Sequence, residues 1–184
     1  MELKHHFLLS MPTLDDGGFF AHTLTYVCEH DENGAMGLVV NRTLDMTVGD
    51  IFVQMNIDPG ELEIAHHSAH LGGPVDQERG FVLHSSDVVW ENSLQTGDGV
   101  SVTSSRDILE ALAVGEGPRD AIVVLGYAAW SAGQLEHELQ QNFWLTCKAS
   151  TDIIFRVGDD KKRDAAAATL GIDLANLSTV AGHA

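Results

Sequence analysis

The chain has 184 residues, of which 44% are hydrophobic, and this suits one domain with a substantial buried core. Its 10 Lys and Arg against 27 Asp and Glu give a formal net charge of −17, which disfavours binding to nucleic acid or to an anionic membrane. We expect residues 1–184 to form a single cytoplasmic domain, because no segment has the pattern of a signal peptide or a membrane span.

The first half of the chain reads as a β-hairpin followed by a helix and another strand. Residues 22–30 are rich in β-branched and aromatic side chains, an Asn-Gly pair suits a tight turn, and residues 35–42 predict the returning strand. The spacing of Thr47 and Asp50 is that of a capping box and predicts that a helix starts there. Residues 71–84 then predict a turn, a short connection and a strand.

Strands and helices alternate irregularly in the second half. Strands are predicted at 99–104, 121–130 and 143–149, and helices at 104–115, 133–142 and 159–171, the last of these being the final helix. Because strands come in antiparallel-looking pairs with helices between only some of them, the pattern favours an α+β fold with a mixed, mostly antiparallel sheet.

Ser131 stands between a predicted strand and a predicted helix, where some hydrolases present their nucleophile. That motif needs a glycine two residues before the serine and two after it, and only the second, Gly133, is present. Asp152 and His183 could complete a triad formally, but a histidine so near the chain end is poorly held. Ser131 and Gln134 instead fit a capping box, so we expect Ser131 to begin a helix. A hydrolase that uses Ser131 stays as an alternative.

Three histidines within five residues invite interpretation as a metal site, since neutral imidazole is a common ligand of zinc and copper. They are His66, His67 and His70. The glutamate of the H-E-x-x-H motif is absent, and no third ligand stands at a fixed spacing. We therefore expect an exposed strand or loop there, with no metal and no cofactor. A metal-assisted enzyme that uses His66 and His70 stays as an alternative.

The remaining candidate groups favour ordinary structural roles. Cys28 and Cys147 lie in strand-like runs without CxxC spacing, which is typical of buried thiols in a reducing compartment. The one basic cluster, residues 161–163, predicts a solvated helix face. The acidic pairs at 15–16 and 159–160 lack the spacing of a calcium loop and predict solvated turns or helix starts.

The order of the motifs is more specific than any one of them. The chain contains, in this order, "YVCEHDENGAMGLVVNR", "GGPVDQERGFVLH", "GYAAWSAGQLEHELQQNFWL" and "LGIDLANLSTVAGHA". Together they resemble the YqgE/AlgH family of bacterial proteins over nearly the whole chain. The resemblance implies a single α+β domain whose bifurcated sheet curls into a pseudo-barrel with helices packed outside. Thr43 and Ala129 depart from the family pattern, which often has proline and glycine at these positions.

The resemblance implies a cytosolic protein and transfers no catalytic residue, because none is agreed for the family. One branch of the family is named for the regulation of alginate production, and its members are for that reason described as transcriptional regulators. The acidic charge and the lack of a basic recognition helix disfavour direct DNA binding.

The signature residues fall mostly at turns and at the ends of predicted elements, where loops usually carry function. We therefore predict a binding patch made of the start of the 132–141 helix, the G-G-P turn and the Asn-Arg pair, used by a non-catalytic binding or regulatory module that acts through a protein partner. The signature and patch residues are Gly34, Gly37, Asn41, Arg42, Gly72, Gly73, Pro74, Gly126, Tyr127, Trp130, Gly133, Gln134 and Glu138.

Overall fold

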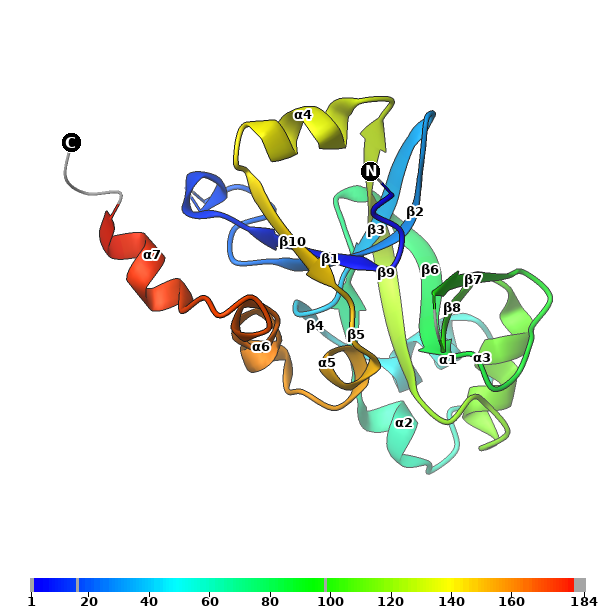
Figure 1. The fold of residues 1–184 in the computed structure, drawn as a ribbon. Helices are drawn as coiled ribbons and strands as arrows, with labels where there is room; N and C mark the ends of the chain where they lie inside the picture. Colours follow the sequence, from blue (N-terminus) through cyan, green and yellow to red (C-terminus); the bar gives the residue numbers. More distant parts are fainter. Residues whose placement is uncertain (1, 16, 98, 181–184) are drawn as a thin grey trace.

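A curled sheet of ten strands organises the chain, and helices pack on its outside (Figure 1). The computed structural model describes residues 2–15, 17–97 and 99–180. The strands run in the spatial order β10-β1-β2-β3-β9-β6-β8-β7, while β4 pairs with β5 and β5 with β9. Their bounds are β1 His6–Ser10, β2 Leu24–Asp31, β3 Gly34–Val39, β4 Thr43–Thr47, β5 Ser68–Leu71, β6 Val75–Ser85, β7 Ser93–Gly97, β8 Val100–Thr103, β9 Ala121–Ser131 and β10 Trp144–Lys148. The predicted α+β fold with a mostly antiparallel, curled sheet is confirmed.

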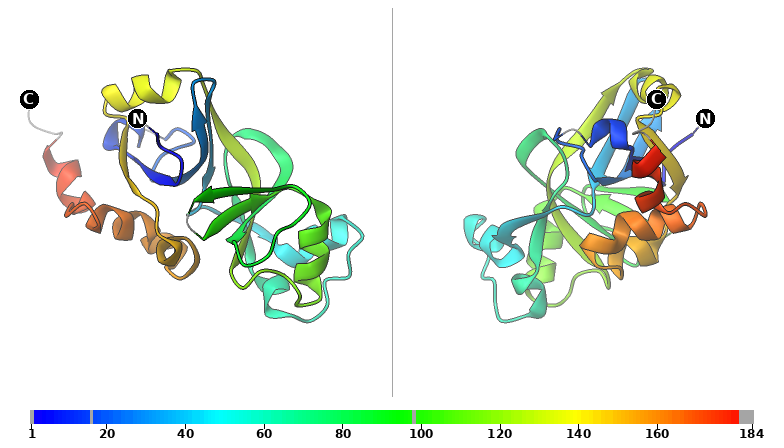
Figure 2. Two further views of the ribbon diagram at one scale, coloured as in Figure 1. Left: turned by 45° about the vertical axis from the view of Figure 1, so that its right-hand side comes forward. Right: turned by 90° about the vertical axis from the view of Figure 1, so that its left-hand side faces the viewer.

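Seven α-helices lie in the described part of the chain, in three places. Helices α1 to α3 cover one side of the sheet, α5 to α7 lie on the other side, and α4 crosses one end (Figure 2). Their bounds are α1 Val48–Gln54, α2 Glu63–His66, α3 Arg106–Ala113, α4 Gln134–Gln140, α5 Thr151–Phe155, α6 Lys162–Ala168 and α7 Leu174–Val180. Two short 3-10 turns, Pro12–Leu14 and Asp159–Lys161, complete the described helical elements.

The elements predicted in the first half are present. The β2–β3 hairpin forms as expected, with Asp31 opposite Gly34 at the turn. The predicted capping box begins α1, since Thr47 Oγ1 accepts the Asp50 N–H at 3.1 Å and Asp50 Oδ2 accepts the Thr47 N–H at 2.9 Å. These hydrogen bonds lower the pKa of the Asp50 carboxyl.

The prediction that the helix at 159–171 is the last one is wrong. Gly171 does end that helical region, with a left-handed φ of +71°. The Asp173 carboxylate then accepts the N–H of Ala175 at 3.0 Å, which supports a new first turn, and α7 follows.

Strand β9 is where the sheet divides. On one edge it pairs with β6 from Ala121 to Leu125 and, past a bulge in β6, at Tyr127. Its other edge pairs in parallel with β5 at Val124 and Leu125, and antiparallel with β3 from Ala128 to Ser131. The chain between these two pairings contains Gly126, which takes a left-handed φ of +73°. The sheet therefore bifurcates at this glycine, as the family resemblance implied.

The glycine pair before β6 packs against this division. Gly72 donates to the carbonyl of Leu125 at 2.8 Å and accepts the N–H of Val39 at 2.8 Å, so it joins β9 to β3. A Cβ on Gly73 would lie 1.9 Å from the carbonyl carbon of Tyr127, far inside contact distance. Only glycine fits where these two backbone segments cross.

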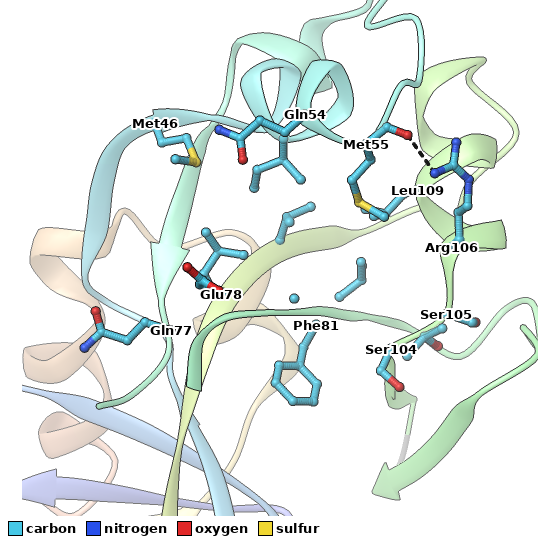
Figure 3. Close-up of a pocket in the computed structure, with 16 residues that line it drawn as sticks. Met46, Gln54, Met55, Gln77, Glu78, Phe81, Ser104, Ser105, Arg106 and Leu109 are labelled. Atoms are coloured by element: carbon cyan, nitrogen blue, oxygen red, sulfur yellow. Dashed lines mark hydrogen bonds between the residues drawn. The ribbon is translucent and has the colours of Figure 1, made fainter. Parts of the chain in front are cut away.

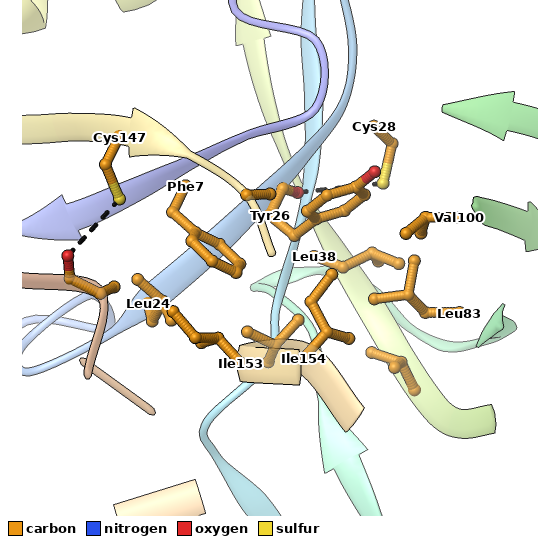
Figure 4. Close-up of a cluster of buried hydrophobic side chains, with 14 of the residues drawn as sticks. Phe7, Leu24, Tyr26, Cys28, Leu38, Leu83, Val100, Cys147, Ile153 and Ile154 are labelled. Carbon is orange, nitrogen blue, oxygen red and sulfur yellow. Dashed lines mark hydrogen bonds between the residues drawn. The ribbon is translucent and has the colours of Figure 1, made fainter. Parts of the chain in front are cut away.

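Three hydrophobic clusters fill the spaces between sheet and helices. The largest lies between the first strands and helices α5 and α6, around Phe7, Tyr26 and Ile154 (Figure 4). The second lies under α1 and α3, and the third lies under α4. Cys28 and Cys147 are both free and buried, so the prediction of buried thiols is confirmed. Burial raises the pKa of both thiols, which makes them poor nucleophiles.

Candidate functional site

Part of the predicted patch lies where β9 meets α4. Gly34 pairs there with Ser131, and Gly37 pairs with Ala128 further along the same ladder. Gly133 precedes the first turn of α4 with a left-handed φ of +76° and serves as its N-cap. These glycines let β3 and the start of α4 approach the end of β9 closely.

A hydrogen-bonded aromatic cluster lies beneath the same helix. One carboxylate oxygen of Glu138 accepts the indole N–H groups of Trp130 and Trp144, each at 2.8 Å, and its other oxygen accepts from Gln134 at 2.9 Å. The two indoles meet edge to face at 6.0 Å, and the ring of Phe20 contacts both. The signature tryptophan and glutamate thus have a shared structural role.

A second part of the predicted patch lies at the division of the sheet, around the crossing of Gly73 and Gly126. Pro74 is exposed beside this crossing. The ring of Tyr127 packs edge to face on Phe81 at 5.7 Å, and the Arg79 guanidinium lies over both rings. In this part of the patch two backbone segments therefore cross, and the rings of Tyr127 and Phe81 lie beside the crossing.

Asn41 and Arg42 hold the loop that precedes β2. The Asn41 amide accepts the Leu24 N–H at 2.8 Å, and the Arg42 guanidinium donates to the carbonyls of Phe19 and Ala21 while stacking on the Phe19 ring. About 16 Å of β9 separates Gly126 from Ser131, so the predicted residues form two groups rather than one continuous patch.

Ser131 does not begin the helix, which corrects the prediction. It is the last residue of β9, and α4 begins at Gln134 after Gly133. Half of the predicted capping box exists, because Gln134 Oε1 accepts the Ser131 N–H at 3.0 Å. The hydroxyl, however, contacts the Gln134 side chain at 3.2 Å instead of accepting a backbone N–H. Its one hydrogen-bond partner in the described chain is therefore an amide, and His183 lies outside the described residues.

The histidine cluster is divided between two elements. His66 is exposed at the end of α2, whereas His70 lies in β5 and is buried, which corrects the prediction of an exposed segment. His70 Nε2 lies 2.9 Å from Asp159 Oδ1. Within residues 2–15, 17–97 and 99–180, no three His, Cys, Asp or Glu side chains gather as a metal site would require.

The basic cluster is not a solvated face, so that prediction is wrong at two of its three positions. The Lys162 side chain is 3% exposed, and its ammonium donates to the Val40 carbonyl at 2.9 Å and to Asp159 at 2.7 Å. Arg163 is largely buried and donates to the carbonyl of Ser10. These cations bind α6 to the sheet.

A cavity with a volume of about 550 Å³ lies between α1, β6 and α3 (Figure 3). Its floor is apolar and includes Ile51, Leu109 and Val123. Gly80 lies in the floor with open space above it, because a Cβ there would meet only Leu125 Cδ2, at 3.7 Å. A group of moderate size could therefore enter between the two helices.

Polar side chains surround the mouth of this cavity. Arg106 bridges the two helices, since it donates to the Met55 carbonyl at the end of α1 and to Glu110 on α3, each at 2.6 Å. Gln77 and Glu78 lie on the opposite lip, which is the exposed first half of β6 (Figure 3). An apolar floor with a polar lip is the usual form of a binding pocket.

Comparison with known proteins identifies the relatives of this fold. A model of the AlgH-like family matches residues 7–175. The chain belongs to the AlgH-like family. Two proteins named UPF0301, from Chromohalobacter salexigens and Thioalkalivibrio sulfidiphilus, are each 50% identical to it, over 182 and 180 residues. These matches cover 98% of this chain in both cases, and 98% and 96% of the relatives. The family resemblance drawn from the motifs is thereby confirmed.

Solved structures agree with the family and the fold. The solution structure of AlgH from Pseudomonas aeruginosa superposes with a TM-score of 0.82 at 44% identity, and the match covers 100% of this chain and 97% of that one. A crystal structure of a Corynebacterium diphtheriae protein superposes with a TM-score of 0.76 at 16% identity, covering 97% and 92%. The second likeness shows the fold alone.

Sequence reasoning about this AlgH-like chain misses the cavity, because its walls come from segments far apart in sequence. The available indication was Gly80, a glycine inside a predicted strand, which often marks an irregularity or a close approach. No helix among the described residues has the length and apolarity that crossing a bilayer requires.

Proposed function

We propose that this AlgH-like protein is a binding module whose cavity between α1, β6 and α3 takes an extended segment of a protein partner. The observation that carries the proposal is the cavity itself: about 550 Å³ with an apolar floor and a polar lip. A volume of this size accommodates one large aliphatic or aromatic side chain with its neighbours.

The open edge of β6 supports an extended shape for the partner. Strand β8 pairs with β6 only from Val82 to Ser85, and no other described strand pairs with that edge before Val82. The earlier residues of β6, among them Gln77 and Glu78, also form the lip of the cavity. A segment added along this edge would gain backbone hydrogen bonds and could place side chains over the cavity, with β6 itself bulged between Val75 and Gly80.

Charge supports a basic segment. The net charge of −17 attracts cationic partners, and Asp76 and Glu78 place two exposed carboxylates along the open edge. The favoured partner segment is therefore extended, with an aliphatic or aromatic anchor flanked by Lys or Arg. Any effect on transcription would pass through such a protein contact, since the same charge opposes a DNA backbone.

A hydrolase that uses Ser131 is the weaker alternative. Its hydroxyl is exposed and has the Gln134 amide as its partner, whereas a serine nucleophile needs a base within hydrogen-bonding reach. A binding role requires no such partner.

Peptide display tests the proposal without assuming a partner. Random peptides of about ten residues are selected against the wild-type protein and against Gly80→Val. The added side chain would lie near Leu125 and occupy part of the cavity floor, and a β-branched residue suits a strand. Gly18→Val is the matched control, because a side chain at exposed Gly18 meets no atom within 4 Å.

The expected result is enrichment of peptides with an apolar anchor and basic flanks that bind the wild type and Gly18→Val but not Gly80→Val. If no peptide is enriched, or if the enriched peptides bind Gly80→Val equally well, the cavity is not the binding site. Enrichment of acidic peptides would contradict the charge argument alone.

A further inference from the structure

A second, smaller cavity of about 230 Å³ lies between the β2–β3 hairpin and strands β6 to β9. Its floor belongs to the largest hydrophobic cluster and includes buried Phe81 and Val102, with half-buried Met36 beside them. Pockets for drug-sized ligands begin at roughly 300 Å³, so this cavity suits a smaller molecule that has an apolar part.

This cavity and the peptide-binding cavity lie on opposite faces of β6. Side chains alternate between the two faces of a strand, and Phe81 belongs to the largest cluster whereas Val82 belongs to the cluster under α1 and α3. A ligand in the smaller cavity is therefore a question separate from the binding of a peptide.

The guanidinium of Arg79 is held over the aromatic wall of the smaller cavity. Its central carbon lies 5.1 Å from the centre of the Phe81 ring and 5.9 Å from the centre of the Tyr127 ring. A guanidinium stacked on rings keeps its N–H groups in its own plane, where they can bind a carboxylate through two hydrogen bonds.

Arg79 differs from the other arginines in the described part of the chain. Each of the others binds a carbonyl or carboxylate oxygen; they are Arg42, Arg106, Arg119, Arg156 and Arg163. Arg79 has the two rings as its partners and no oxygen acceptor among the described residues. In a chain with 27 Asp and Glu, an arginine without a carboxylate is an exception, and its donors are available to a ligand.

Glu29 places the opposite charge on the same cavity. A bulge in β2 between Val27 and Glu29 turns this stretch, so that Cys28 and Glu29 both line the cavity, although neighbours in a regular strand face opposite sides. Glu29 and Arg79 are both exposed and form no ion pair with each other. The cavity therefore has a separated carboxylate and guanidinium at its mouth and an apolar floor beneath them.

We infer that this cavity binds a free α-amino acid with an aliphatic side chain such as that of leucine. The α-carboxylate accepts from Arg79, the α-ammonium donates to Glu29, and the side chain lies on the floor beside Phe81 and Met36. A free amino acid has both charged groups on one carbon, whereas the terminus of a peptide has one of them and would leave either Arg79 or Glu29 without a partner.

Calorimetry and NMR of the whole chain test the inference with four probes. L-leucine has all three recognised groups, and each of the other probes lacks one of them. Isocaproate lacks the ammonium, isoamylamine lacks the carboxylate, and glycine lacks the side chain. The affinities of these three relative to leucine report on Glu29, Arg79 and the apolar floor, respectively.

Arg79→Gln and Glu29→Gln each remove one charge at an exposed position, so both variants should fold. Arg119→Gln and Glu32→Gln are the matched controls, because both side chains are exposed and lie outside the wall of this cavity. The amide spectrum of each variant without ligand verifies that the fold is intact.

The wild type is expected to bind L-leucine about tenfold more tightly than each of the other three probes. Arg79→Gln should weaken leucine binding about tenfold and remove the preference for leucine over isoamylamine, because the carboxylate no longer has its partner. Glu29→Gln should remove the preference over isocaproate, and the two control variants should bind as the wild type does.

No binding of L-leucine by the wild type at millimolar concentration, or equal binding by Arg79→Gln, would overturn the inference. Isocaproate that binds as tightly as leucine would contradict the role of Glu29 and with it the assignment to an amino acid. Glycine that binds as tightly as leucine would contradict the role of the apolar floor.

Discussion

Two carboxylates, at opposite ends of the molecule, are each held by a pair of hydrogen bonds to a single oxygen atom. Glu138 accepts two hydrogen bonds at one oxygen, from the indoles of Trp130 and Trp144. Asp159 also accepts two at one oxygen, from His70 and Lys162. Glu138 joins residues within eight positions of it, whereas Asp159 binds His70 from 89 positions away, and the donors differ in kind.

The difference lies in what the donors can still do. Each indole has a single N–H, so Trp130 and Trp144 are satisfied once Glu138 accepts it. Imidazole and ammonium have further hydrogen-bonding atoms and can change their protonation, and His70 keeps an unpaired nitrogen beside a cavity. A carboxylate bound by indoles therefore belongs to a cluster whose donors are all used, whereas a carboxylate bound by imidazole and ammonium has partners that can still bind other groups.

Removing the acceptor of the indole cluster should have the largest effect. In Glu138→Leu two nearly buried indole N–H groups lose their partner, and each unsatisfied buried donor costs about 1–3 kcal/mol. The free energy of unfolding should therefore fall by about 2–6 kcal/mol. Urea unfolding followed by tryptophan fluorescence measures the change.

Glu138→Gln is the matched control, because its amide oxygen can still accept from both indoles. It should cost about 1 kcal/mol, the difference between a charge-assisted and a neutral hydrogen bond. Equal losses for the Leu and Gln variants would mean that the charge, and not the acceptor, stabilises this end of the molecule.

Acid should weaken the other carboxylate cluster. The pKa of Asp159 is about 2 in the folded chain and about 3.9 when unfolded, so its stabilisation is complete above about pH 4 and is lost as pH falls toward 2. Because the Asp159 side chain is 32% exposed, we expect its ionisation to contribute about 1–2 kcal/mol to the free energy of unfolding, which is less than the pKa shift alone would give. The stability gap between wild type and Asp159→Asn should shrink by that amount between pH 5 and pH 2, as urea unfolding measures.

Asp160→Asn provides the control for this window, since Asp160 is the adjacent and exposed carboxylate. Its gap from the wild type should change little over the same pH range. A gap for Asp159→Asn that stays constant with pH would show that the cluster is held by packing rather than by charge.

The elements that sequence reasoning predicted here depend on near neighbours. The β2–β3 hairpin follows from its turn, and α1 follows from the Thr47–Asp50 capping box. The indole cluster was present only as a family signature, without its hydrogen bonds. Its members Trp130 and Glu138 are eight residues apart, so the sequence could place them together but not predict which groups pair.

The Asp159 cluster was missed because its partners are distant in the chain. His70 lies 89 positions from Asp159, and Val40 lies 122 positions from Lys162, so neither contact has a local pattern. Two local indications existed: Asp159 and Lys162 have the i,i+3 spacing of an ion pair, and Lys162 shares a helical face with buried Ala166. A basic run was read as solvated because long cations usually are.

The smallest effect should come from Ser131, and it decides how α4 begins. If Ser131 capped the helix, Ser131→Ala would cost about 0.5–2 kcal/mol. Among the described residues its hydroxyl instead contacts the exposed Gln134 side chain alone, so we expect a change within about 0.5 kcal/mol. Thermal and urea unfolding of the variant measure this change.

Gln134→Ala is the informative comparison, because Gln134 both accepts the Ser131 N–H and donates to Glu138. We expect that variant to lose about 1 kcal/mol, since the start of α4 and the Glu138 carboxylate each lose one hydrogen bond. A larger loss for Ser131→Ala than for Gln134→Ala would restore the serine as the residue that begins the helix. A larger loss for Gln134→Ala would mean that Gln134 links the exposed turn before α4 to the buried indole cluster through its hydrogen bonds to Ser131 and Glu138.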